Sequence, residues 1–158
     1  MLRRNASAAI TGLALAACGG PPPSPVTAPP QSDPGFVVLD NHELRYGTVP
    51  ATGLPHEVAA TYGIERRAGV LVLSVSVLRR EEGRLPAPVE ASLSGRQRSL
   101  VGEPVALEFR ELRSGSGPSW VAEIFPTAPG MVLIDFEALP VEGGPRLRAS
   151  LMREIAAR

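Results

Sequence analysis

The sequence predicts an all-β domain, a sandwich or barrel of about seven to eight short antiparallel strands with one short helix. Three observations lead to this prediction. Apolar and polar residues alternate in several segments, sequences rich in Gly and Pro separate those segments at fairly even spacing, and only one segment has a helical pattern. The expected turns are Glu82-Gly83, Ser94-Gly95, Ser114–Pro118, Ala128–Gly130 and Glu142–Pro145.

The clearest predicted strand is Val70–Arg79. Its alternation places four aliphatic side chains on one face and Ser74 and Ser76 on the other. The same alternation predicts half-buried strands at Val105–Arg110, Val132–Glu137 and Leu147–Leu151. Weaker strand patterns cover Phe36–Asp40, Glu43–Val49, Val89–Leu93 and Trp120–Phe125.

One helix is expected, at Leu54–Gly63. A Pro and an acidic residue stand in its first turn, and Gly63 is a typical helix stop. A helix of about two turns is not stable alone. We therefore interpret it as a connector that packs on the sheets through Val58 and Tyr62.

The N-terminus has the pattern of an export signal. Arg3 and Arg4 precede the nearly uncharged run Ala6–Ala17. About twelve apolar residues span roughly 18 Å as a helix, which is short of a hydrocarbon core of about 30 Å. The run is therefore interpreted as the apolar region of a signal peptide and not as a membrane span.

The run ends in Leu15-Ala16-Ala17-Cys18, which has the form of a bacterial lipobox. We therefore expect residues 1–17 to be removed and Cys18, the single cysteine of the chain, to carry the lipid, including palmitate. Three acyl chains give stable anchoring. Gly19 follows instead of Asp, which favours the outer membrane facing the periplasm. The alternative is an ordinary secretory signal cleaved near Ala17, with Cys18 unmodified.

Residues 18–34 are expected to be a linker, followed by one β-sandwich domain at 35–158. Seven of the sixteen residues in Gly19–Pro34 are Pro, which favours an extended polyproline II spacer. At about 3.1 Å per residue the spacer reaches at most about 50 Å. A soluble tail without a spacer role is the alternative.

Composition and charge exclude several function classes. The chain has 16 basic and 16 acidic residues, and cleavage before Cys18 leaves a slightly acidic remainder with 14 basic and 16 acidic residues. A nucleic-acid partner is therefore not expected. One Cys excludes an intramolecular disulfide and Cys-rich zinc sites, and no cofactor is expected.

No residue pattern predicts catalysis. Ser116 lies in a Gly-rich turn but lacks the nucleophile spacing of serine hydrolases. The pairs His42-Glu43 and His56-Glu57 offer at most two imidazoles and two carboxylates, and adjacent strand residues point to opposite faces. We expect His42 and Glu43 to be surface or partly buried, with no metal site. Glu81-Glu82 follows two arginines and is interpreted as part of a solvated, charged turn.

The candidate binding surface surrounds the short helix. Mixed charges beside an aromatic side chain are typical of a polar interaction rim, although they are equally typical of an exposed connector. The surface comprises His56, Glu57, Tyr62 and Arg66, flanked by Glu65 and Arg67.

Two long blocks resemble a family of small exported bacterial proteins, the domain-of-unknown-function family DUF4426. They are LPHEVAATYGIERRAGVLVLSVSVL at residues 54–78 and FRELRSGSGPSWVAEIFP at residues 109–126. Residues 89–103 fit the Ser-Gly turn of the family. The resemblance covers about residues 36–155 and implies an exported, immunoglobulin-like antiparallel β-sandwich, without an established activity.

These observations predict a non-enzymatic envelope lipoprotein. Its sandwich is expected to bind an unidentified envelope protein or envelope component while the lipid anchor holds it at the membrane. A periplasmic domain that binds a small ligand or a metal, using His56, Glu57 or Tyr62, is the alternative. An unrecognised hydrolase is the third hypothesis.

Overall fold

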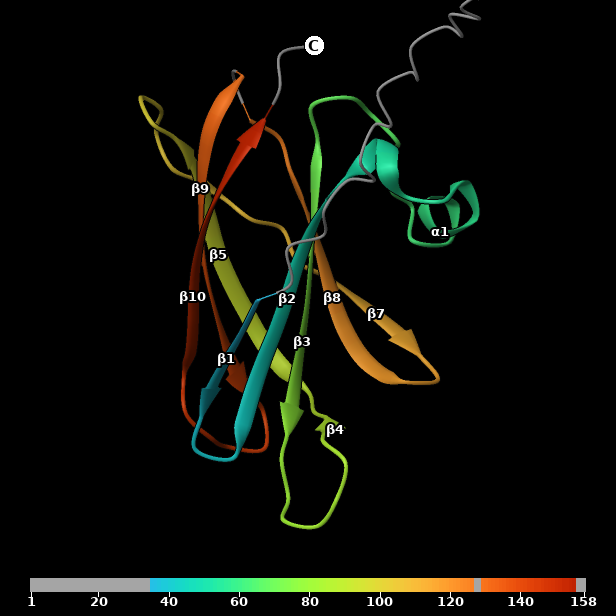
Figure 1. Ribbon diagram of the computed structural model, residues 1–158, viewed down its shortest axis with the longest axis vertical. Coiled ribbons are helices and arrows are strands. Elements are labelled where there is room, and N and C mark those ends of the chain that lie inside the picture. The colour runs from blue at the N-terminus through green and yellow to red at the C-terminus, as the bar shows by residue number, and fades with distance from the viewer. Residues whose placement is uncertain (1–34, 127–128, 156–158) are drawn as a thin grey trace, which may run out of the picture.

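The structure is a computed structural model that describes residues 35–126 and 129–155. In this part of the chain two antiparallel sheets pack face to face, and one short helix lies beside them (Figure 1). This arrangement confirms the predicted all-β sandwich. The predicted signal peptide, the lipidation site Cys18 and the predicted linker at 18–34 lie outside the described residues. No helix in the described ranges is long and apolar enough to cross a membrane.

Sheet A has the strand order β1-β2-β3-β8-β7, with β4 paired to β3. Its strands are β1 (Gly35–Leu39), β2 (His42–Pro50), β3 (Leu71–Arg79), β4 (Ala87–Pro88), β7 (Arg110–Ser114) and β8 (Gly117–Ile124). Sheet B has the order β10-β9-β5-β6. Its strands are β5 (Ala91–Ser99), β6 (Val105–Ala106), β9 (Gly130–Pro140) and β10 (Leu147–Ile155).

The main core lies between the two sheets. The alternation predicted for β3, β9 and β10 is confirmed, because their alternate aliphatic side chains point into this core. The ring of Phe136 lies at its centre, 5.3 Å from the ring of Tyr46 and 6.5 Å from that of Phe109 between centroids. The largest fully buried side chains are Leu44, Leu73, Val75, Val77, Ile124, Val132, Ile134 and Leu147.

A connector between β2 and β3 covers part of the outer face of sheet A. It contains the 3-10 helix η1 (Ala51–Gly53) and the helix α1 (His56–Thr61). The predicted helix stop is confirmed, since Gly63 has a φ of 61° just beyond the helix. Ala59 and Tyr62 pack into a second apolar cluster, whereas Val58 stays outside it. The predicted contact through Val58 is therefore wrong, because Ala59 faces the sheet.

Ser94-Gly95 is not a turn, contrary to the prediction. Both residues lie in the middle of β5, where Gly95 pairs with Phe136 of β9. A Cβ at Gly95 would stand 2.8 Å from both the carbonyl oxygen of Asp135 and the Cβ of Phe136. Gly95 therefore permits a close approach of two strands and does not reverse the chain.

The single strand predicted at Val105–Arg110 is also wrong. β6 ends at Ala106 and pairs with β5 in sheet B, whereas β7 starts at Arg110 and pairs with β8 in sheet A. Between them, the amide of Leu107 donates a hydrogen bond to the carbonyl of Gly95 at 2.9 Å, and the side chain of Leu107 is buried. The segment alternates because it crosses from one sheet to the other over the core.

The outer strands of both sheets are protected from pairing with another chain. β7 carries the charged side chains Arg110, Glu111 and Arg113, and β6 has only two residues. β1 lies against β10, so that the first and last strands close one side of the sandwich (Figure 1). Charges, short length and coverage are ways in which proteins block edge-to-edge association.

Candidate functional site

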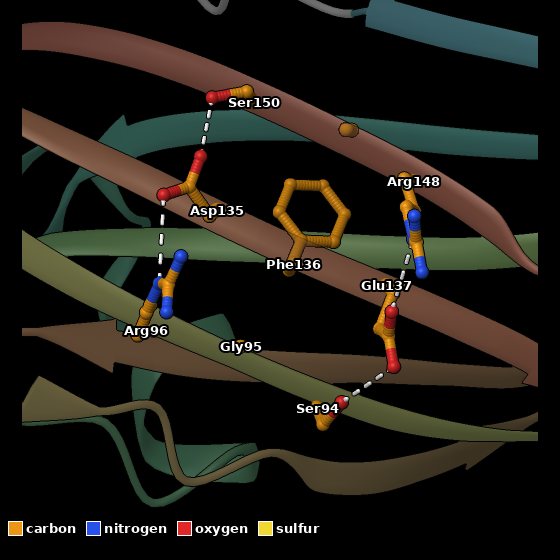
Figure 2. Close-up of a pocket in the computed structure, with 9 residues that line it drawn as sticks. Ser94, Gly95, Arg96, Asp135, Phe136, Glu137, Arg148 and Ser150 are labelled. Atoms are coloured by element: carbon orange, nitrogen blue, oxygen red, sulfur yellow. Dashed lines mark hydrogen bonds and ion pairs between the residues drawn. The ribbon is translucent and has the colours of Figure 1, made fainter.

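The outer face of sheet B carries an open groove across its three long strands. Its volume is about 690 Å³. The polar side chains around it come from β5, β9 and β10, and Figure 2 shows them in two rows across the strands. We call this set the carboxylate ladder; its members are Ser94, Arg96, Asp135, Glu137, Arg148 and Ser150.

The first row is centred on Glu137 of β9. The strand register places Ser94 of β5 and Arg148 of β10 opposite it. Nε of Arg148 lies 3.3 Å from Oε2 of Glu137, and the hydroxyl of Ser94 donates to Oε1 at 3.4 Å. Arg146, in the turn before β10, also donates to Oε1. Both oxygens of this carboxylate are therefore occupied.

The second row is centred on Asp135, two residues earlier on the same face of β9. In this row the arginine, Arg96, comes from β5 and the serine, Ser150, comes from β10, which is the reverse of the first row. Nε of Arg96 lies 3.7 Å from Oδ2 of Asp135, and the Ser150 hydroxyl donates to Oδ1. Each carboxylate thus lies between one arginine and one serine, in opposite order in the two rows (Figure 2).

Arg146 and the ladder residue Arg148 hold Glu137 in its ionised form. Partial removal from water by itself raises the pKa of this carboxyl, but the charges and hydrogen bonds of Arg146 and Arg148 outweigh that effect. The pKa of Glu137 therefore lies below its usual range. A carboxylate that stays ionised and fully engaged is a poor proton donor, so this row is suited to positioning arginines and not to acid catalysis.

The guanidinium groups at the groove keep unused donors. The side chains of Arg96 and Arg148 are mostly exposed, and each uses only one nitrogen on its carboxylate. Arg presents five N–H donors in a planar fork that matches carboxylates and phosphates. Arg96 and Arg148 line the groove, and Arg146, which does not line it, pairs with Glu137, so that three cations neutralise two carboxylates here. The chemistry of the groove therefore suits an anionic group held by hydrogen bonds from arginine.

The surface predicted around the short helix is only partly assembled. His56 and Arg66 line one small cavity of about 220 Å³ next to Ala59. Nη2 of Arg66 donates to the carbonyl of Thr52 at 2.7 Å, which ties it to the start of the connector. Two of the predicted residues thus share a cavity.

The other two predicted residues do not line that cavity. Tyr62 is half-buried against the second apolar cluster, and its carbonyl accepts a hydrogen bond from Nη1 of Arg110 at 3.1 Å. Glu57 is exposed on the first turn of α1. Tyr62 therefore fastens the connector to sheet A, and the four residues form no single site.

His42 and Glu43 are both buried, contrary to the expectation of surface or partly buried positions. His42 is 5% exposed; its ring lies against Gly144, and its Nδ1 has no hydrogen-bond partner. Glu43 faces the other way and pairs with Nε of Arg45 at 2.5 Å and Nη1 of Arg80 at 3.7 Å. Packing against the turn between β9 and β10 and a pair of arginines explain their burial.

Ser116 and the acidic turn behave as ordinary loop residues. The hydroxyls of Ser116 and Ser114 are 2.7 Å apart at the hairpin between β7 and β8, so the neighbour of Ser116 is another serine. Glu81 pairs with Arg84 and Arg79 at 2.8 and 3.3 Å. Within the described ranges there is no group of three or more His, Cys, Asp or Glu side chains that is placed to hold a metal ion.

A second groove lies on the uncovered part of the outer face of sheet A. Its volume is also about 690 Å³, and its floor consists largely of small residues such as Gly47, Ser74 and Ser76. Glu43 and Arg45 at its side are paired with each other. This groove offers fewer free donors than the ladder, so the ladder is the better-built candidate.

A family model matches residues 37–151, which include both sheets and the connector. The model is described as a domain of unknown function, DUF4426. The chain belongs to the DUF4426 family. This membership confirms the family resemblance noted in the sequence. No match was found among curated proteins.

Solved structures resemble this DUF4426 chain in fold. A DUF4426 family protein from Pseudomonas aeruginosa PAO1 is 22% identical, with a TM-score of 0.62 over 77% of this chain and 94% of that chain. A copper-bound variant of FetP from uropathogenic Escherichia coli strain F11 is 14% identical, with a TM-score of 0.55 over 81% of this chain and 99% of that chain. FetP as isolated, expressed in the periplasm of E. coli, gives the same identity and TM-score over 78% and 95%.

The residues of the ladder were not among the predicted site residues. The alternation in β9 and β10 had placed Asp135, Glu137, Arg148 and Ser150 on a solvated face. The sequence does contain one indication of the ladder: β9 has acidic residues at alternate positions, and β10 has Arg and Ser at alternate positions. What turns this pattern into a site is the register of three strands, and Ser94 is 43 residues from its partner.

Proposed function

We propose that this DUF4426 protein is a lipid-anchored envelope protein whose sandwich is a non-enzymatic binding module for an anionic envelope component. The groove over the carboxylate ladder carries the proposal, since its arginines keep free donors while their carboxylate partners fix their positions. The lipobox at Cys18 supplies the anchor, and the likeness to FetP expressed in the periplasm supports the same compartment.

The ladder favours recognition of an extended anion over a catalytic role. Arg96 and Arg148 lie at diagonal corners of the groove, because the two rows have opposite order. An anionic group between them would accept hydrogen bonds from arginines on two strands, while Ser94 and Ser150 at the other two corners donate to the carboxylates and help to hold them in place. Carboxylate- or phosphate-bearing polymers of the envelope have this chemistry.

The anchor is tested in cells with Cys18→Ala. We expect the original chain to fractionate with membranes and to incorporate labelled palmitate, and the variant to lose both. Retention of membrane fractionation together with palmitate labelling in the variant would contradict lipidation at Cys18.

The binding surface is tested by photo-crosslinking in cells. A photoreactive residue at Ser94, inside the groove, is expected to form a reproducible crosslink to one specific component. A photoreactive residue at Ser116, in an exposed turn on sheet A, is expected to form crosslinks only to abundant envelope components. Adding Arg96→Gln and Arg148→Gln should abolish the specific adduct. Identical adducts from both positions, or an adduct that survives both substitutions, would remove the ladder as the binding surface.

A metal-binding module is the second candidate, and the copper-bound FetP variant is the observation that favours it. The donors in the described ranges do not fit it, because no three of them gather at one place. Copper titration of the folded domain distinguishes the two candidates. A true site stabilises the fold by about 2.7 kcal/mol at a hundredfold excess over the dissociation constant, and the anion-binding proposal predicts no such shift with copper.

A further inference from the structure

The turn between β5 and β6 presents two aliphatic side chains at its apex. The amide of Gly102 donates a hydrogen bond to the carbonyl of Ser99 at 3.3 Å, which places Leu100 and Val101 at the two central positions. Leu100 is 70% exposed and Val101 is fully exposed at 101%. Val105, where the chain returns, is half exposed. The apex therefore adds apolar surface to the solvent and nothing to the core.

This apex is unusual because both of its central residues are aliphatic. Polar residues and Gly dominate turns because they adopt turn conformations and interact with water. The hairpins at Asp40-Asn41 and Gly115-Ser116 obey this preference. The turn between β9 and β10 has one exposed aliphatic residue, Val141, beside Glu142 at its centre, whereas the β5–β6 turn has two. Residues that break a local rule without a packing gain are expected at functional positions.

The apex lies at the end of the sandwich from which the chain enters β1. Nε of Arg153, near the end of β10, donates to Oγ1 of Thr48 at 2.8 Å, so the ends of β10 and β2 meet. Ser99, at the end of β5, pairs with Val132 near the start of β9, which in turn pairs with Arg153. β1 runs antiparallel to β2 and therefore starts on this side, and Figure 1 shows the loop after β5 at the same end.

The distances and charges allow this end to touch the membrane. Gly35 pairs with Tyr46, four residues before the end of β2 at Pro50, which is roughly 13 Å at 3.3 Å per residue. An extended linker of sixteen residues reaches about 50 Å, well beyond that length. Arg98 and Glu103 are exposed on the two sides of the apex, so the charges beside it balance and the contact with lipid is apolar.

We propose that Leu100 and Val101 insert into the lipid surface that holds the anchor, so that the β5–β6 turn is a second membrane contact. This inference rests on the proposed lipid anchor. An acyl anchor leaves the orientation of a domain free, and an apolar tip that inserts into lipid restricts it. One end of the sandwich then faces the bilayer, and the ladder groove lies along its side.

The test uses the full lipidated chain in vesicles of phosphatidylethanolamine and phosphatidylglycerol. Spin labels are attached at Val101→Cys or at Leu85→Cys, since the native Cys18 is blocked by lipid. Leu85 is the matched control because it is 91% exposed in the loop between β3 and β4, at the opposite end (Figure 1). We expect oxygen, which concentrates in lipid, to relax the Val101 label, and a water-soluble nickel chelate to relax the Leu85 label.

Each outcome has one meaning. Flotation of the chain with the vesicles tests the anchor, and a chain that does not float refutes the proposed function. A chain that floats while its Val101 label remains fully accessible to nickel refutes the second contact and leaves the anchor standing. Leu100→Ser in the labelled chain should move the Val101 label toward the nickel-accessible state, and an unchanged label would also count against insertion.

Discussion

The two sheets share one core, but their outer faces differ in what covers them. On sheet A the connector packs over Val72 and Val121, and a second apolar cluster forms there. On sheet B the outer side chains of β9 include Asp135 and Glu137, which meet Arg and Ser from the neighbouring strands. A covered face thus needs apolar side chains on both sides of a strand, whereas a face in water needs strict alternation.

The largest expected effect comes from placing a charge under the connector. Val72 is 3% exposed on the outer side of β3, so Val72→Asp would bury an unpaired carboxylate. We expect a loss of at least about 3 kcal/mol in the free energy of unfolding, measured by urea denaturation. The matched control is Leu139→Asp on the outer side of β9, where the side chain is 41% exposed and the change should stay within about 1 kcal/mol. Equal losses would mean that the two faces do not differ.

The next effect concerns the tight approach of strands in sheet B. Gly95→Ala places a Cβ 2.8 Å from backbone and side-chain atoms of β9, and we expect a loss of about 1–3 kcal/mol in the free energy of unfolding. Gly102→Ala is the control, because its nearest contact would be 3.5 Å and its φ is not positive. That change should be neutral or slightly stabilising. A neutral Gly95→Ala would show that β5 and β9 are free to separate.

A smaller loss of stability is expected from removing the contact between the connector and sheet A beneath it. Nη1 of Arg110 donates to the carbonyl of Tyr62, and Nη2 lies 2.6 Å from Oε1 of Glu123. Arg110→Gln should cost about 1 kcal/mol and speed hydrogen exchange in α1. Arg113→Gln, whose arginine pairs with Glu90 and Glu111 away from the connector, should leave exchange in α1 unchanged. Equal exchange in both variants would contradict a clasp at Arg110.

The strands predicted correctly from the sequence are those whose side chains alternate regularly between the core and the solvent. In the part of β3 that the connector does not cover, Ser and aliphatic residues alternate. In β9 and β10, buried and more exposed side chains alternate along the strand. The run Val70–Leu73 is buried at every position, which is consistent with the connector lying over it. Local alternation was sufficient there because each side chain meets either the core or the water.

The errors arose where a residue serves a partner far away in the chain. A Ser-Gly pair fits a turn as well as it fits the middle of a strand, and only the contact of Gly95 with Phe136 of β9 decides between them. The segment from Val105 to Arg110 alternates although it changes sheets, because Leu107 still points into the core. The ladder was missed for the same reason, since register is a property of pairs of strands.

The smallest expected effect is the pH dependence of the ladder. In the folded protein the pKa of Glu137 lies below its usual value, because Arg146 and Arg148 outweigh the partial loss of water that raises it. A lowered folded pKa adds stability above the unfolded value of about 4.3, and that stability is lost as the pH falls through the folded pKa. Glu137→Gln should therefore be less stable than the original chain at neutral pH, and the difference in denaturation midpoint should vanish in acid. High salt should also reduce this difference, since the ion pairs of Glu137 are exposed.

Glu154→Gln is the control, because Glu154 lies on the same face of β10 but outside the ladder. Its denaturation midpoint, compared with that of the original chain, should show no such dependence on pH. The same dependence in both variants would mean that the arginines of sheet B act through the overall charge of the face and not through the ladder.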